Sequence, residues 1–195
     1  MAMRALGKGS IAEIIRVGLV ISWIVLWVAA AALVAMAIAY ALHVGGIVDF
    51  GTMFGPNSRI RIDDNVVVSP ITTPSWPVVV PAFLIGAVVI TGGMMIVWRL
   101  RKLFDSFCSG EPFAKENATH LRAIWMTMIG IEVARYLLLA LTGFLLLHFG
   151  GPLAQNTDIK LSVNLSTWAS ILILVVLAEV FREGARMKAE QELTI

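Results

Sequence analysis

The sequence predicts an all-α membrane protein. We expect a bundle of four transmembrane helices, with a small β-hairpin-like outer loop and helical extensions on the cytoplasmic side. Hydrophobic residues make up 58% of the 195 residues and charged residues only 14%, and the mean hydropathy is +0.86. A soluble domain of this length carries more surface charge, so lipid should be the solvent for much of the chain. The length suits one integral membrane domain, residues 1–195.

Four apolar stretches are long enough to cross a bilayer, which takes about 20 helical residues each. They comprise residues 17–42, 77–98, 123–149 and 165–181. Each should be helical, because backbone polar groups in lipid must be paired within their own segment. The parts outside the membrane are two outer loops, 43–76 and 150–164, an inner hairpin, 99–122, and a cytoplasmic C-terminal helix, 182–195.

The distribution of basic residues predicts the orientation. With the N-terminus inside, eleven basic residues fall on the cytoplasmic side and three, Arg59, Arg61 and Lys160, fall outside. This bias places both termini in the cytoplasm. The alternative is a signal peptide cleaved near Ala37 or Ala41, but the apolar run before these sites is longer than the usual 7–15 residues of a signal.

The first outer loop contains the hairpin pattern. Residues 59–62 alternate polar and apolar side chains, residues 63–65 are typical of a turn, and residues 66–68 are three valines. Two interpretations are open: a flap that senses a ligand or partner, and a cap over the helix ends.

The inner hairpin and the C-terminal helix carry more distinctive residues. Apolar residues at helical spacing, Leu100, Leu103, Phe104 and Phe107, should continue the second span as an amphipathic helix that ends at Ser109-Gly110. The hairpin's basic residues either lie among lipid headgroups or form a docking surface for a cytoplasmic protein. Residues 182–195 mix both signs of charge, which predicts an ion-paired helix.

Charged residues also occur inside the third span. Glu132 and Arg135 are three residues apart and hence on one helix face. A charge near the bilayer centre costs about 2.5–3.5 kcal/mol on insertion scales, so both should face the interior and pair. Glu179 would complete an intramembrane polar cluster if the third and fourth helices pack together. The cluster is a structural pair that sets helix register, a proton or ligand site, or a conformational switch.

Small residues recur at four-residue spacing in the first two spans, for example Ala31, Ala35 and Ala39, and Ala82 and Gly86. Such spacing allows close approach of helices. The approach could occur within the bundle or in a homo-oligomer, and the sequence leaves both alternatives open.

The sequence contains none of the common nucleotide-binding, metalloprotease or serine-hydrolase motifs. We therefore expect no enzymatic activity, no catalytic residues, no metal site and no cofactor. A net charge of +2 gives no indication of direct nucleic-acid binding.

Two segments carry a family resemblance. Residues 103–113, with Glu116-Asn117 and residues 121–124, resemble the bacterial YoaS-like membrane proteins, and so does the ending, residues 177–185 and 190–194. These are small four-span proteins without an assigned function. Their genes often neighbour that of a small Cro/CI-type helix-turn-helix regulator, so the resemblance implies a membrane partner that sequesters or releases a transcription factor.

The leading hypothesis is a non-enzymatic regulatory membrane protein that senses an outer or membrane signal and controls a cytoplasmic partner. The alternatives are a small transporter that uses Glu132 and Arg135, and a structural or assembly factor. The lipid bilayer is an expected partner in each case. The candidate docking residues are Phe104, Gly110, Pro112, Phe113, Glu116, Asn117, Arg122, Arg182, Glu183 and Arg186. A second interpretation is open for these cytoplasm-facing residues: they only lock the helix ends together.

Overall fold

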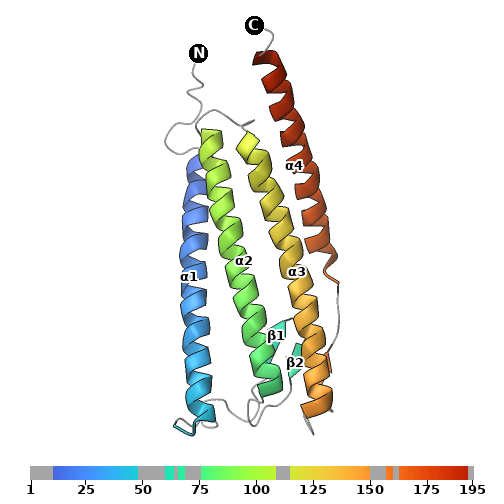
Figure 1. The fold of residues 1–195 in the computed structure, drawn as a ribbon. Coiled ribbons are helices and arrows are strands. Elements are labelled where there is room, and N and C mark those ends of the chain that lie inside the picture. The colour runs from blue at the N-terminus through green and yellow to red at the C-terminus, as the bar shows by residue number, and fades with distance from the viewer. Residues whose placement is uncertain are drawn as a thin grey trace. The chain divides into compact units, whose positions relative to one another are not determined.

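Four helices dominate the fold. The computed structural model describes residues 11–47, 60–63, 66–68, 76–108, 115–149, 157–159 and 163–192. The helices are α1 (Ile11–Val44), α2 (Trp76–Cys108), α3 (Lys115–Phe149) and α4 (Leu165–Glu192), and the strands are β1 (Ile60–Asp63), β2 (Val66–Val68) and β3 (Thr157–Ile159) (Figure 1).

All four helices are long and apolar enough to cross a membrane. The prediction of four such helices is confirmed, and the chain is a multi-pass membrane protein. The helices continue beyond the apolar stretches: α2 runs to Cys108, α3 begins at Lys115, and α4 runs to Glu192. A helix of 35 residues, the length of α3, extends about 52 Å, against about 30 Å of hydrocarbon core. Part of α3 therefore lies outside the core or compensates by tilting.

The chain forms two compact units, each described here by itself. Unit 1 comprises Met1–Val28, Thr91–Gly130 and Leu165–Ile195, and unit 2 comprises Ala29–Ile90 and Ile131–Asn164.

The core of unit 1 is built from α2, α3 and α4. Leu103, Leu121 and Ala178, one from each helix, are buried together, and the rings of Phe107 and Phe181 lie 5.6 Å apart beside them. Helix α1 contacts α2 in this unit, where the guanidinium of Arg101 lies over the ring of Trp23, 5.9 Å from its centroid. Unit 1 is therefore a small apolar core closed by three helices, with the fourth on one side.

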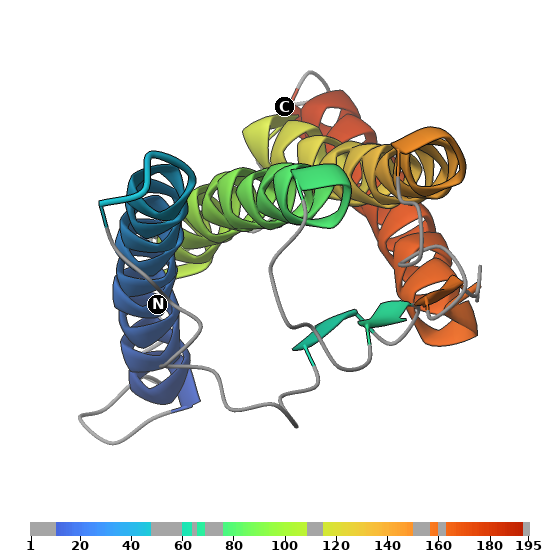
Figure 2. The same cartoon turned by 90° about the horizontal axis from the view of Figure 1, so that it is seen from below.

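Unit 2 holds a second apolar core between α2 and α3. Val78 and Ile85 of α2 pack against Leu139 and Leu146 of α3. Two ring pairs lie at its edges: Trp76 and Phe149 at 5.4 Å, and Tyr40 and Phe83 at 6.3 Å. Within this unit α2 lies between α1 and α3 in both views (Figures 1 and 2).

A three-stranded antiparallel sheet in unit 2 has the order β1-β2-β3 (Figure 2). Ile60 pairs with Val68, and the register shifts between Arg61 and Asp63. Strand β3 then pairs Thr157 with Val68. The sheet thus joins backbone from the two segments that flank α2 and α3. The turn residues 64 and 65 lie outside the described residues.

Gly86 permits a close contact between α1 and α2 within unit 2. A Cβ atom at this position would lie 2.7 Å from Cδ1 of Leu33, whereas nothing lies within 4 Å of the corresponding position at Gly130. The small residue at position 86 therefore serves packing within the chain.

We expect Gly86→Leu to weaken this packing. The added side chain must displace Leu33 and separate the helices, and overpacking of this kind typically costs about 1–3 kcal/mol. The measurement is thermal unfolding of the purified protein in mild detergent. Gly130→Leu is the matched control and should leave the midpoint nearly unchanged. Leu33→Ala should partly restore the Gly86→Leu variant, and equal effects at positions 86 and 130 would contradict this interpretation.

Candidate functional site

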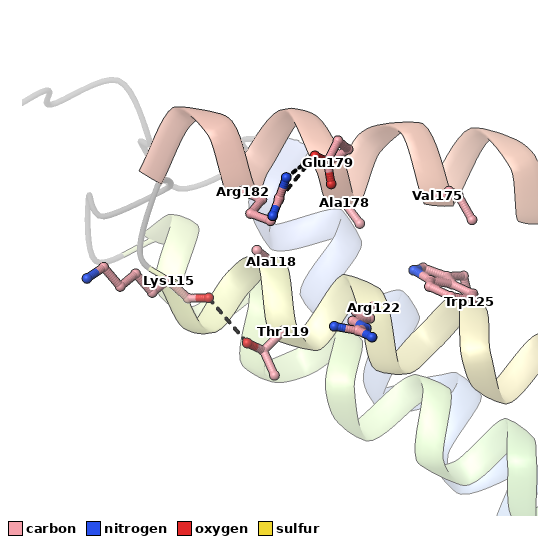
Figure 3. Close-up of a pocket in the computed structure, with 9 residues that line it drawn as sticks. All are labelled: Lys115, Ala118, Thr119, Arg122, Trp125, Val175, Ala178, Glu179 and Arg182. Carbon is pink, nitrogen blue, oxygen red and sulfur yellow. Dashed lines mark hydrogen bonds and ion pairs between the residues drawn. The ribbon is translucent and has the colours of Figure 1, made fainter. Parts of the chain in front are cut away.

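A groove lies between α3 and α4 in unit 1, with a volume of about 540 Å³. We call it the α3–α4 groove. Figure 3 shows two facing rows of side chains along it. Helix α3 contributes Lys115, Ala118, Thr119, Arg122 and Trp125, and α4 contributes Val175, Ala178, Glu179 and Arg182.

The local sequence of α3 explains why this face is presented. Asn117, Leu121 and Ile124 are almost completely buried, and their spacing places them on one side of the helix. Ala118 and Arg122 follow these positions by one residue. They therefore lie on the neighbouring side, which lines the groove.

Two hydrogen bonds hold α3 against α2 at this end of unit 1. Asn117 Nδ2 donates to Ser106 Oγ at 2.9 Å. Arg99 Nη1 lies 3.1 Å from Nδ1 of His120. Because arginine can only donate, His120 must accept at Nδ1 in this bond, and its ring is then neutral. The pair of helices that carries one wall of the groove is thus fixed by polar as well as apolar contacts.

The charges in the groove are not balanced. Arg182 donates to Glu179 through Nε and Nη2 on the same helix. Within the described part of the chain, no ion pair involves Lys115 or Arg122. Three cationic side chains and one carboxylate line the groove, so it carries an excess of two positive charges.

A second hollow of about 320 Å³ adjoins the groove at the polar end of α4, and we call it the terminal hollow. Its lining residues are Lys115, Ala118, Arg182, Glu183, Ala185, Arg186 and Ala189. Arg186 lies 2.6 Å from the carboxylate of Glu183 and 3.5 Å from that of Glu190. Three alanines therefore line the terminal hollow, together with Lys115 and with Arg182, Glu183 and Arg186, which form ion pairs on α4.

Only some of the predicted docking residues line the two hollows. Arg122, Arg182, Glu183 and Arg186 line one or both hollows. Phe104 and Glu116 are described but line neither hollow, and Gly110, Pro112 and Phe113 lie outside the described residues.

The prediction for Asn117 needs correction. This side chain is only 1% exposed and bonds to Ser106. It therefore joins α2 to α3 and presents no surface to a partner.

A different polar pair lies in unit 2. Arg135 Nη2 donates to Glu132 Oε2 at 2.8 Å, and the two side chains are only 14% and 10% exposed. The guanidinium also lies 5.1 Å from the ring centroid of Tyr136. Glu179 belongs to unit 1 and pairs with Arg182 there, so a cluster of Glu179 with Glu132 and Arg135 stays a prediction. Among the described residues, no three His, Cys, Asp or Glu side chains gather into a metal site.

Several residues of the groove were not found from the sequence. Thr119, Trp125 and Val175 belong to no motif and were not among the predicted site residues. Their place in the groove depends on which face of α4 packs against α3. The sequence pattern of a single helix does not show this. The burial of Asn117 had a detectable signal, because this residue shares the spacing of Leu121 and Ile124.

Replacing Glu132 and replacing Arg135 should lower the stability of the protein by different amounts. Glu132→Gln leaves a guanidinium that stays charged, whereas Arg135→Gln leaves a carboxyl group that can bind a proton and become neutral. Removal of one partner of a buried pair typically costs about 3–5 kcal/mol. We expect Glu132→Gln to lower the unfolding midpoint more than Arg135→Gln, measured by thermal unfolding in detergent. An exposed control, Glu190→Gln, should change it little, and a larger loss from Arg135→Gln would contradict the explanation.

Comparison with known proteins identifies a family. A family model described as "Protein of unknown function (DUF2975)" matches residues 69–195, more than half of the chain. The match includes α2, α3 and α4 and therefore both hollows. Neither the search of curated proteins nor that of solved structures found a significant match. The resemblance to YoaS-like proteins and the neighbouring regulator stay predictions. The chain therefore belongs to the DUF2975 family, whose description assigns it no function.

Proposed function

We propose that this protein is a non-enzymatic regulator in the bacterial cytoplasmic membrane that binds a cytoplasmic protein and thereby controls or sequesters it. The observation that carries the proposal is the terminal hollow: three alanines line it, and its Arg182, Glu183 and Arg186 side chains form ion pairs within α4. The signal would reach it from the outer side or from the membrane itself.

The alanines that line the terminal hollow suit a helical partner. Ala118, Ala185 and Ala189 leave space above α3 and α4, and alanines four residues apart on one helix let a second helix approach closely. A helix that lies in this space would bury apolar surface without displacing a large side chain.

The ion pairs at the terminal hollow can be replaced by ion pairs with a partner. Arg186 and Glu183 are on the same helix and largely exposed. Exposed ion pairs are worth about 0–1 kcal/mol, so a partner can replace them at little cost. Oppositely charged side chains on the partner would then add specificity. The implied helix-turn-helix regulator is a small helical protein of the required kind.

The proposal requires the end of α2, the start of α3 and the end of α4 to lie in the cytoplasm. The excess of basic residues in the predicted inner segments supports this orientation. Strands β1–β3 would then belong to the outer side, where they cover the other helix ends or sense a ligand.

Cys108 offers a direct test of orientation, because it is the only cysteine and is exposed at the end of α2. A membrane-impermeant maleimide should leave it unlabelled in intact spheroplasts and label it after permeabilisation. His43→Cys in a Cys108→Ser background is the control at the predicted outer end of α1, and it should be labelled without permeabilisation. The reverse pattern would contradict a cytoplasmic terminal hollow.

Filling the terminal hollow should abolish partner binding. We expect Ala189→Leu or Arg186→Glu to remove a soluble protein that co-purifies with the wild type from native membranes in mild detergent. The reason is that leucine occupies the space for the partner helix, and the charge reversal repels its acidic side chains. Mass spectrometry of the eluates is the measurement.

Lys188→Glu is the matched control for these variants. It changes the charge as Arg186→Glu does, two residues further along α4, but Lys188 lines neither hollow. Equal recovery of the partner with wild type and Lys188→Glu, and its loss with the two hollow variants, would support docking there. Equal recovery with all four proteins would contradict it.

A transport function has one observation in its favour, the buried Glu132–Arg135 pair in unit 2. A wild-type preparation that brings down no soluble protein would favour this alternative. Flux into proteoliposomes should then collapse in Glu132→Gln. If neither a partner nor flux is found, a structural or assembly role would be favoured.

A further inference from the structure

We propose that the α3–α4 groove binds an anionic phospholipid, with Arg122 as the main contact of the headgroup phosphate. The groove shares Lys115, Ala118 and Arg182 with the terminal hollow, whereas Arg122, Trp125 and Val175 line only the groove. The inference does not depend on the proposed docking function.

The groove crosses the boundary between polar and apolar sequence. Arg122 is the last residue before the apolar stretch that begins at residue 123. On the apolar side the groove is lined by Trp125 and Val175, and on the polar side by Lys115 and Arg182 (Figure 3). An occupant that satisfies both parts needs a charged end and an apolar end, which is the build of a phospholipid.

The charge of the groove selects an anionic headgroup. Arg122 is exposed and has no carboxylate partner among the described residues. A guanidinium matches the geometry of a phosphate and can form two parallel hydrogen bonds with it. Lys115 adds a second cation, and the one carboxylate of the groove, Glu179, is neutralised by Arg182. The net charge around a phosphate bound near Arg122 is therefore positive.

Two other cations of unit 1, Lys102 and Arg99, lie outside the groove. Lys102 and Arg99 lie over the ring of Trp98, at 4.0 and 5.0 Å from its centroid. Neither of them lines the α3–α4 groove or the terminal hollow. These residues can attract anionic lipid only through general surface charge, which makes Lys102 a matched control for Arg122.

The apolar side of the groove argues for a lipid over an acidic protein segment. Trp125 packs against the core of Leu103, Leu121 and Ala178, so its ring is held at the groove. An acidic peptide would leave Trp125 and Val175 uncovered, whereas an acyl chain would lie along them.

The test is lipid binding to the full-length protein in non-ionic detergent, by native mass spectrometry during titration with phosphatidylglycerol or phosphatidylcholine. We expect the wild type to bind phosphatidylglycerol more tightly than phosphatidylcholine. Arg122→Gln should weaken this binding about tenfold, the effect of losing one charge-assisted contact. Lys102→Gln should change it less than about twofold. Val175→Asp, which places a carboxylate beside the acyl chain, should also weaken it.

Three results would overturn the proposal. One is equal retention of phosphatidylglycerol by wild type and Arg122→Gln, when gel filtration shows both to be folded. Another is displacement of the lipid by millimolar inorganic phosphate, which would assign the groove to a soluble phosphate compound. The third is displacement by an oligoglutamate peptide, which would assign it to an acidic protein segment.

Discussion

The rest of this structure depends on one requirement, that backbone amides in an apolar solvent bond within their own helix. It explains why nearly all the described residues are helical and why the helices have few buried contacts. Ile21, Ile24 and Val25 of α1, for example, are all more than half exposed. In water this would be a large loss of free energy, whereas in lipid the acyl chains cover these side chains. Packing then needs only local cores, such as Leu103 with Leu121 and Ala178.

One ion-pair geometry recurs in different surroundings. Glu132–Arg135, Glu179–Arg182 and Glu183–Arg186 each join a glutamate to the arginine three residues later on the same helix. The first pair is nearly buried, while the side chains of the second are 70% and 62% exposed. In these three pairs the two charges neutralise each other within one helix. The exposed pairs remain available for exchange with a ligand or partner, and the buried pair does not.

The sequence was sufficient to predict the number and approximate limits of the helices, because the apolar stretches are long and the charges sit at their ends. It was not sufficient for the groove. The row of Ala118, Arg122 and Trp125 is visible on α3 once the buried side of that helix is known. The contribution of Val175 depends on the rotation of α4, which three-dimensional packing determines. Asn117 was named as a docking residue, although its spacing on the helix is that of the buried residues Leu121 and Ile124.

The hydrogen bond from Asn117 to Ser106 has a mechanical consequence. It crosses between the last turns of α2 and the first turns of α3, next to the segment that links them. The bond therefore ties the end of α2 to the start of α3 within unit 1. The bond would have to shear before either helix could slide along the other.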